Sequence, residues 1–112
     1  MEKNVKISIL CDLYGNLLTK KQFEFLNDSY NNDLTLSEIA ENKKITRQAV
    51  RDNIIKGEKK LLEYETKLKF MKKTMNQEKV FKEVVKELSE IEKDSKDKRI
   101  TTIKAKIEDL II

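Results

Sequence analysis

The chain has 112 residues, including 24 Lys and Arg, 20 Asp and Glu, one Cys, no His and no Pro. That length supports one small domain with a helical extension. The absence of His excludes Ser-His-Asp and Cys-His catalytic units and the common zinc ligand sets. We therefore expect a protein that is not an enzyme and that needs no metal or cofactor. The lone Cys fits a reducing cytoplasm, and no apolar run is long enough to span a bilayer.

Apolar residues follow a helical period along almost the whole chain, which predicts an all-α fold. In the first helix, Gly15 is placed to end the helix as a left-handed cap. Thr19 and Gln22 then form a capping box, in which each side chain bonds the backbone N–H of the other residue, and they open a second helix. The apolar stripe of the first helix consists of Val5, Ile9, Leu10 and Leu13, and that of the second consists of Phe23, Leu26 and Tyr30.

A second capping box, Thr35 with Glu38, predicts a short third helix, and Thr46 is placed to cap the helix that follows. From there apolar residues recur every seven positions, which predicts one helix over residues 46–73, about 42 Å long at about 1.5 Å per residue. Thr74 begins a third capping box, so we expect the helix to restart there. The heptad series consists of Ile54, Leu61, Leu68 and Met75.

Two further apolar stripes follow, at residues 80–91 and 100–110. The charged segment 92–99 between them is either a solvated helix or a flexible link. The heptad series that ends at Met75 and the stripe at 80–91 fold as a helical hairpin or form an interface between equivalent helices of two copies of the chain. A second apolar series on the long helix consists of Val50, Tyr64 and Met71, and Gly57 interrupts it, where it either permits close packing or weakens the helix by about 1 kcal/mol.

The window LSEIAENKKITRQAVRDNI, residues 36–54, has the apolar pattern of a helix-turn-helix. Two helices that cross at a steep angle need a small residue at the crossing, and Ala40 fits that place. We expect Ile45 to anchor the turn as a buried residue, and Val50 and Ile54 to pin the second helix.

The second helix of this window carries the polar residues that a recognition helix uses in its first two turns. Arg suits bidentate contact to guanine or phosphate, Gln suits adenine, and a helix N-terminus suits a backbone phosphate. Residues 46–73 carry nine Lys or Arg and four acids, a net charge of +5 that attracts phosphate. A solvated basic face is the alternative interpretation. The candidate nucleic-acid-binding residues are Lys44, Thr46, Arg47, Gln48 and Arg51.

Two stretches of the chain resemble known DNA readers. LTKKQF, followed by LTLSEIAE, resembles the C-terminal, promoter-reading region of bacterial sigma factors. LTLSEIAENKKITRQAVRDNI, continuing into EKKLLEYETKL, is similar to the YlxM family of small helix-turn-helix proteins from low-GC Gram-positive bacteria, over about residues 5–70. That resemblance implies a regulatory protein that takes part in, or tunes, the signal recognition particle pathway, because members of the family are encoded beside its genes.

The sigma-factor resemblance places Arg47 and Gln48 at base-contacting positions and Arg51 at a backbone-contacting position. Asp52 departs from the pattern, since sigma factors often carry Gln there. A carboxylate at this place repels phosphate unless it accepts a hydrogen bond from cytosine or pairs with Arg.

We thus predict an all-α protein with a helix-turn-helix domain of the sigma factor C-terminal type at 1–60. An elongated helical extension at 61–112 mediates self-association or partner binding. The predicted function is DNA-binding regulation in the cytoplasm by a homodimer, with double-stranded DNA and signal recognition particle components as partners. The alternative, favoured by Asp52, is a protein-interaction module that modulates signal recognition particle components without sequence-specific DNA binding.

Overall fold

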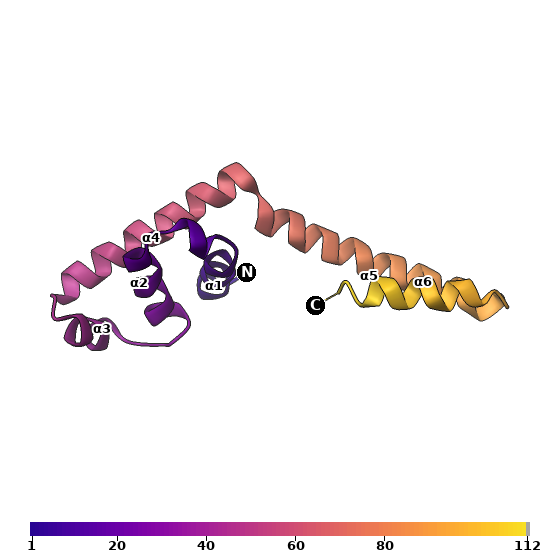
Figure 1. The fold of residues 1–112 in the computed structure, drawn as a ribbon, viewed down its shortest axis with the longest axis horizontal. Helices are drawn as coiled ribbons and strands as arrows, with labels where there is room; N and C mark the ends of the chain where they lie inside the picture. Colours follow the sequence, from indigo (N-terminus) through magenta and orange to yellow (C-terminus); the bar gives the residue numbers. More distant parts are fainter. Residues whose placement is uncertain (112) are drawn as a thin grey trace. The chain divides into compact units, whose positions relative to one another are not determined.

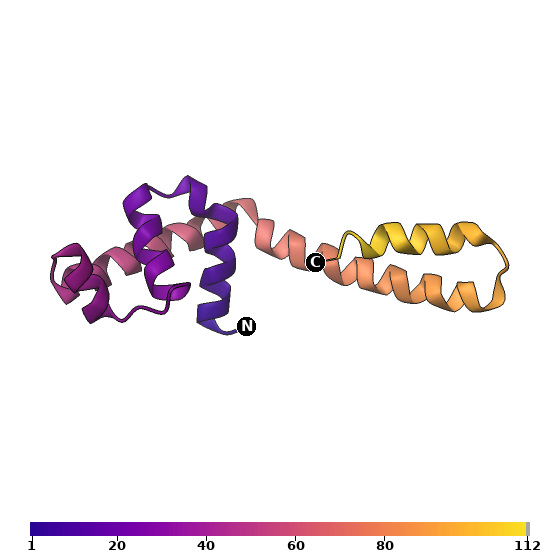
Figure 2. The ribbon, with the colours of Figure 1, turned by 60° about the horizontal axis from the view of Figure 1, so that its bottom comes forward.

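The structure, a computed structural model, describes residues 1–111, which form helices joined by short turns with no strand among them (Figures 1 and 2). The all-α fold predicted from the apolar period is therefore confirmed. The elements in chain order are α1 (Lys3–Tyr14), the 3₁₀ turn η1 (Gly15–Leu17), α2 (Lys20–Tyr30), α3 (Leu36–Lys43), α4 (Arg47–Leu68), α5 (Phe70–Asp94) and α6 (Lys98–Glu108).

The chain divides into two compact units, Met1–Met71 and a second unit from Lys72 onward. This division differs from the predicted one after residue 60, which would cut through α4. Leu61 is buried in the core of the first unit, and Tyr64 packs against the same core. The first unit extends beyond residue 60 because the C-terminal half of α4 still covers apolar residues of α1 and α2.

The first unit is organised around α4, against which α1, α2 and α3 all pack (Figure 1). Thr19 and Gln22 bond each other's backbone N–H at 3.1 Å, which confirms the first predicted capping box. Thr35 and Glu38 form the second box at 3.1 and 3.2 Å. Each box satisfies backbone N–H groups that a helix start leaves without an intrahelical acceptor. The core consists of Ile7, Leu10, Cys11, Tyr14, Leu18, Phe25, Leu26, Ile39, Ala40, Val50, Ile54 and Leu61.

The buried face of α1 differs from the predicted stripe. Leu10 of that stripe is buried, but Val5 and Leu13 are exposed, and Ile7, Cys11 and Tyr14 complete the buried face. Both the predicted set and the buried set of residues have helical spacing. The set with Cys11 and Tyr14 faces the core, because a small thiol and a large ring fill the space against α2 and α4. Burial, and then the nearby Asp12 carboxylate, raises the pKa of the Cys11 thiol to about 11, so the thiol stays protonated.

Both glycines are needed for close packing rather than for a left-handed turn. Gly15 has φ −53° and ψ −37°, a right-handed conformation that continues into η1, so the predicted left-handed cap is wrong. A Cβ at Gly15 would lie 2.9 Å from Cε2 of Phe23. A Cβ at Gly57 would lie 2.8 Å from Cδ1 of Leu26. Of the two roles that the sequence left open for Gly57, the structure therefore shows the close approach of α4 to α2.

The long helix predicted over 46–73 ends early. Lys69 adopts a left-handed conformation with φ 57°, so α4 stops at Leu68 and α5 begins at Phe70. The predicted restart at Thr74 is therefore wrong, because Thr74 lies inside the continuous helix α5.

Side chains from the first unit satisfy the N–H groups at the start of α5. The hydroxyl of Tyr14 accepts a hydrogen bond from the Phe70 N–H at 3.0 Å and donates one to Glu65 Oε1 at 2.6 Å. The same carboxylate oxygen accepts the Met71 N–H at 3.0 Å. Helix starts need such acceptors, and here a buried tyrosine and a carboxylate from α4 supply them before residue 74 is reached. A local capping box further along is therefore not used.

Tyr30 gives the first unit a dependence on alkaline pH. Its hydroxyl donates to Glu58, and burial followed by this bond raises the Tyr30 pKa above its ordinary value. The bond's contribution is complete below pH about 10, where the unfolded tyrosine starts to ionise, and falls as pH rises towards the folded pKa. We expect Tyr30→Phe to lower the unfolding free energy by about 1 kcal/mol at pH 8 and to lose less stability than the wild type above pH 10. Urea unfolding at graded pH measures both, and parallel pH profiles would contradict the assignment.

In the second unit α6 runs back antiparallel beside α5 (Figures 1 and 2). Glu92 of α5 accepts hydrogen bonds from Thr101 at 3.0 Å and from Lys104 at 3.5 Å. The predicted hairpin between the heptad series that ends at Met75 and the stripe at 80–91 is therefore wrong, because Met75 and residues 80–91 lie on one continuous helix, α5, and the hairpin is formed by α5 and α6 instead. The charged segment 92–99 contributes to both helices, since α5 continues to Asp94 and α6 begins at Lys98.

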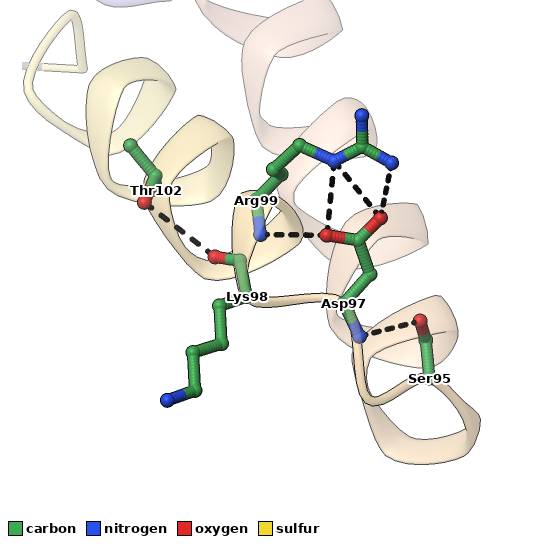
Figure 3. A network of polar contacts seen from close by, with 5 residues as sticks. All are labelled: Ser95, Asp97, Lys98, Arg99 and Thr102. Carbon is green, nitrogen blue, oxygen red and sulfur yellow. Dashed lines mark hydrogen bonds and ion pairs between the residues drawn. The ribbon is translucent and has the colours of Figure 1, made fainter.

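Local polar contacts close the turn between α5 and α6 (Figure 3). The Asp97 carboxylate accepts the backbone N–H of Arg99 at 3.0 Å and its Nη2 at 2.5 Å. The Arg99 guanidinium, and then its backbone N–H, holds the pKa of Asp97 below its ordinary value. Ser95 accepts the Asp97 N–H at 3.1 Å, so the link is fixed by its own side chains.

Candidate nucleic-acid interface

The helices α3 and α4 pack against each other as the two helices of a helix-turn-helix. Ala40 of α3 is buried, and so are Val50 and Ile54 of α4, as the apolar pattern predicts. These residues hold α4 by one side and leave the opposite side of its first turns on the surface.

The turn between the helices is closed by the backbone. Lys44 is left-handed, with φ 56° and ψ 45°, at a place where many such motifs carry Gly. Its N–H donates to the carbonyl of Glu41 at 3.3 Å, and the N–H of Ile45 donates to the carbonyl of Ala40 at 3.1 Å. The Ile45 side chain is exposed, so its predicted role as a buried anchor is wrong. These two C-terminal capping bonds of α3 fix the turn without it.

All the candidate residues are exposed at the turn or on the first two turns of α4. Thr46 caps this helix, because its Oγ1 accepts the Ala49 N–H at 3.0 Å. The earlier N–H groups of α4 have no intrahelical acceptor, and the helix dipole adds a partial positive charge at this end. A phosphate oxygen is a suitable partner for such a helix start.

Arg47 and Arg51 are four residues apart and therefore lie on the same side of α4. Both are exposed, and within residues 1–111 neither forms an ion pair with an acidic side chain. Lys43 differs, because it pairs with Glu24 at 3.2 Å and lies over the ring of Phe25 at 5.0 Å. Lys43 thus joins α3 to α2, whereas the two arginines are open to an anion from outside.

Gln48 is the candidate whose side chain is already engaged. Its Nε2 donates to Asp52 Oδ1 at 3.0 Å. The sequence pattern indicates Asp52 only as a source of repulsion for phosphate, although its spacing of four residues from Gln48 on one helix is a signal for this bond. The bond holds the amide on the surface of α4 and occupies one of its two donors.

No cluster of three or more His, Cys, Asp and Glu that could hold a metal occurs in residues 1–111. Over the same residues no helix is both long enough and apolar enough to cross a membrane.

The fold and the packing of α3 on α4 place the chain in the class of helix-turn-helix proteins. Residues 1–103 match the family UPF0122, described as "Putative helix-turn-helix protein, YlxM / p13 like", and the chain belongs to this family. The family resemblance noted from the sequence is therefore confirmed.

Relatives named as UPF0122 proteins match most of the chain. One from Clostridium botulinum is 44% identical over 98% of this chain and 100% of its own length. One from Acetivibrio thermocellus is 39% identical over 99% of this chain and 95% of its own length. A third, from Fusobacterium nucleatum, is 48% identical over 70% of this chain and 78% of its own length. The similarity thus covers both units.

Proposed function

We propose that this protein is a non-enzymatic regulator that acts in the cytoplasm and binds double-stranded DNA through the turn and the first two turns of α4. The observation that carries the proposal is the pair Arg47 and Arg51, exposed on one side of the second helix of a helix-turn-helix and without acidic partners in residues 1–111. In this class of fold, the N-terminal part of the second helix enters the major groove.

Each candidate residue has a role that its chemistry supports. The guanidiniums of Arg47 and Arg51 suit guanine or phosphate oxygens, and the Lys44 ammonium suits the backbone beside the turn. Thr46 holds the helix start in the conformation that presents free N–H groups to a phosphate. Gln48 reads adenine after its bond to Asp52 opens, since bidentate contact needs both its amide oxygen and its amide nitrogen.

The binding form that we propose is a homodimer. One helix-turn-helix of this kind offers few base contacts, and two copies on neighbouring half-sites combine their contacts on one duplex. If the protein binds as a symmetric dimer, its DNA target site should also be two-fold symmetric.

A duplex titration at two salt concentrations tests DNA binding. Lys44, Arg47 and Arg51 would neutralise about three phosphates per copy, so the logarithm of the binding constant should fall against the logarithm of salt with a slope of about −3 per copy. Selection from a random duplex pool supplies the target sequence. Absence of binding at low salt, together with an empty selection, would overturn the proposal.

A second candidate function is supported by the bond between Gln48 and Asp52. Because Asp52 accepts a hydrogen bond from the Gln48 amide, the two side chains form a polar patch that suits contact with a protein surface rather than with adenine. In this case α3 and α4 act as a scaffold, and the partner is a protein component of the signal recognition particle. Binding of the purified component that persists after nuclease treatment, combined with an empty duplex selection, would favour this function over the first.

A further inference from the structure

The hairpin of α5 and α6 does not bury its own apolar residues. Within residues 72–111 no side chain is buried, although both helices carry an apolar face. One row of half-buried residues includes the contact of Glu92 with Lys104. It consists of Phe81, Val85, Leu88 and Glu92 on α5, of Ile100, Lys104 and Ile107 on α6, and of Ile111 beyond the end of α6. A pair of helices leaves the apolar residues between them open to solvent on both sides, whereas a four-helix bundle encloses them.

A second row of residues lies beside this packed row on each helix. The outer stripe of α5 consists of Val80, Val84, Glu87 and Ile91, and the outer stripe of α6 consists of Arg99, Ile103 and Lys106, continued by Leu110 two residues beyond the end of the helix. Four of the apolar members are exposed: Val80 by 44%, Ile91 by 53%, Ile103 by 46% and Leu110 by 58%.

The two outer stripes lie on the same side of the hairpin. Each stripe residue comes one position before a packed residue, which is a rotation of about 100° in the same sense on both helices. An antiparallel helix pair has a two-fold axis perpendicular to the plane that contains both helix axes. Rotation about this axis exchanges the two helices but leaves each face of the pair on its own side. Equal rotations in the same sense therefore bring both stripes to one face, which we call the stripe face.

The contacts of Glu92 with Thr101 and Lys104 set the level of one helix against the other. Counting along the two helices in opposite directions from these contacts, Ile91 lies level with Ile103. Val84 lies level with Leu110 by the same count. The stripe face therefore has two apolar layers.

Between these layers lies one charged layer. Glu87 and Lys106 are level with each other, both are exposed, and neither has an ion-pair partner within residues 1–111. The stripe face thus carries an acid on one helix and a base on the other, between two apolar layers.

We propose that a second copy of this chain covers the stripe face, with α5 of one copy over α6 of the other, to form a four-helix bundle. The proposal deepens the homodimer of the proposed function and locates its interface. A two-fold axis parallel to the helices keeps every layer level, so Ile91 meets the partner's Ile103 and Glu87 meets the partner's Lys106. All neighbouring helices are then antiparallel, as in common bundles.

The charged layer selects this arrangement over its main competitor. If α5 instead crossed the partner's α5, a two-fold axis at the middle of the face would place Glu87 against the partner's Glu87. Like charges in a desolvated interface oppose association, whereas opposite charges steer and align it. Charge complementarity therefore identifies both the occupant and its orientation.

Sedimentation velocity of the full chain at graded concentrations, without DNA, tests the proposal. We expect the wild type to be a dimer and the variant Ile91→Glu/Ile103→Glu to dissociate at concentrations about 100-fold higher or more, since it buries charges in both copies. The control Met75→Glu/Ala105→Glu changes exposed apolar residues away from the stripe face and should dimerise as the wild type does. A monomeric wild type, or equal weakening by the two variants, would overturn the proposal.

Charge reversal tests the pairing of α5 with α6. Glu87→Lys and Lys106→Glu should each weaken the dimer by about tenfold, because each places like charges together at both symmetric positions. Mixing the two variants should restore dimers, since the positions changed by Glu87→Lys and Lys106→Glu then face each other in one half, and the unchanged Glu87 and Lys106 face each other in the other half. Single variants that dimerise as well as the wild type, or a mixture that does not recover, would overturn the pairing.

Duplex binding by the same variants keeps the two proposals distinct. A wild-type dimer that binds no duplex overturns DNA binding and leaves the interface standing. A monomeric wild type that binds duplex through single half-sites overturns the interface and leaves DNA binding standing.

Discussion

Replacing Arg47 and Arg51 together with Ala should weaken duplex binding by about 100-fold or more, which corresponds to about 3 kcal/mol. Each guanidinium is exposed and supplies two parallel donors to guanine or phosphate, and neither supports the core. Helix content and thermal unfolding should therefore stay unchanged. Fluorescence anisotropy with a duplex from the selection, at one fixed salt concentration, measures the loss.

The matched control is Lys56→Ala with Lys59→Ala, which removes the same charge from exposed positions further along α4. Beyond the first two turns the helix leaves the groove, so this variant should lose less than about fivefold in affinity. Equal losses in the two variants would mean that α4 attracts duplex by its overall charge. That result would contradict recognition by its first turns.

Phe25→Ala should destabilise the first unit by about 3–5 kcal/mol. The ring is 0% exposed, so its removal loses buried apolar area and leaves a cavity in the core of the first unit. It also removes the surface over which Lys43 lies at 5.0 Å. Chemical unfolding followed by far-ultraviolet circular dichroism measures the change, which is large beside the 5–15 kcal/mol typical of small domains.

Phe23→Ala is the matched control, because it removes the same ring from the same helix two residues earlier. Phe23 is 36% exposed at the edge of the core. We expect less than half the loss seen for Phe25→Ala, since less area leaves the core and water reaches the gap. Similar losses would show that Phe23 is as important to packing as Phe25.

The parts of the fold that the sequence predicted correctly are those with local causes. The capping boxes at Thr19 and Thr35 form because each involves residues three positions apart, which meet at any helix start. The cap at Thr46 follows the same rule. The helix-turn-helix was visible because Ala40 and Val50 stand at positions where two crossing helices require a small and an apolar residue.

The wrong predictions concern features that depend on distant residues. Gly15 was predicted to end the first helix as a left-handed cap, but it is right-handed, and the ring of Phe23 lies close to where its Cβ would be. Thr74 has a good capping sequence, but Tyr14 and Glu65 start α5 earlier. Ile45 is a different case, because local backbone bonds to Ala40 and Glu41 close the turn without its side chain, and no apolar pattern distinguishes an exposed Ile from a buried one.

The sequence by itself determined the all-α class, the helix starts at Thr19, Thr35 and Thr46, and the concentration of positive charge on residues 46–73, because helical period, capping and charge are local properties. Only the tertiary structure decided which face of α1 is buried, why Gly57 is small and where α4 ends, because each depends on a residue far away in the chain. It also showed that Arg47 and Arg51 are unpaired among the described residues while Gln48 is held by Asp52. The same side-chain types thus differ in availability, and packing and hydrogen bonding set that difference.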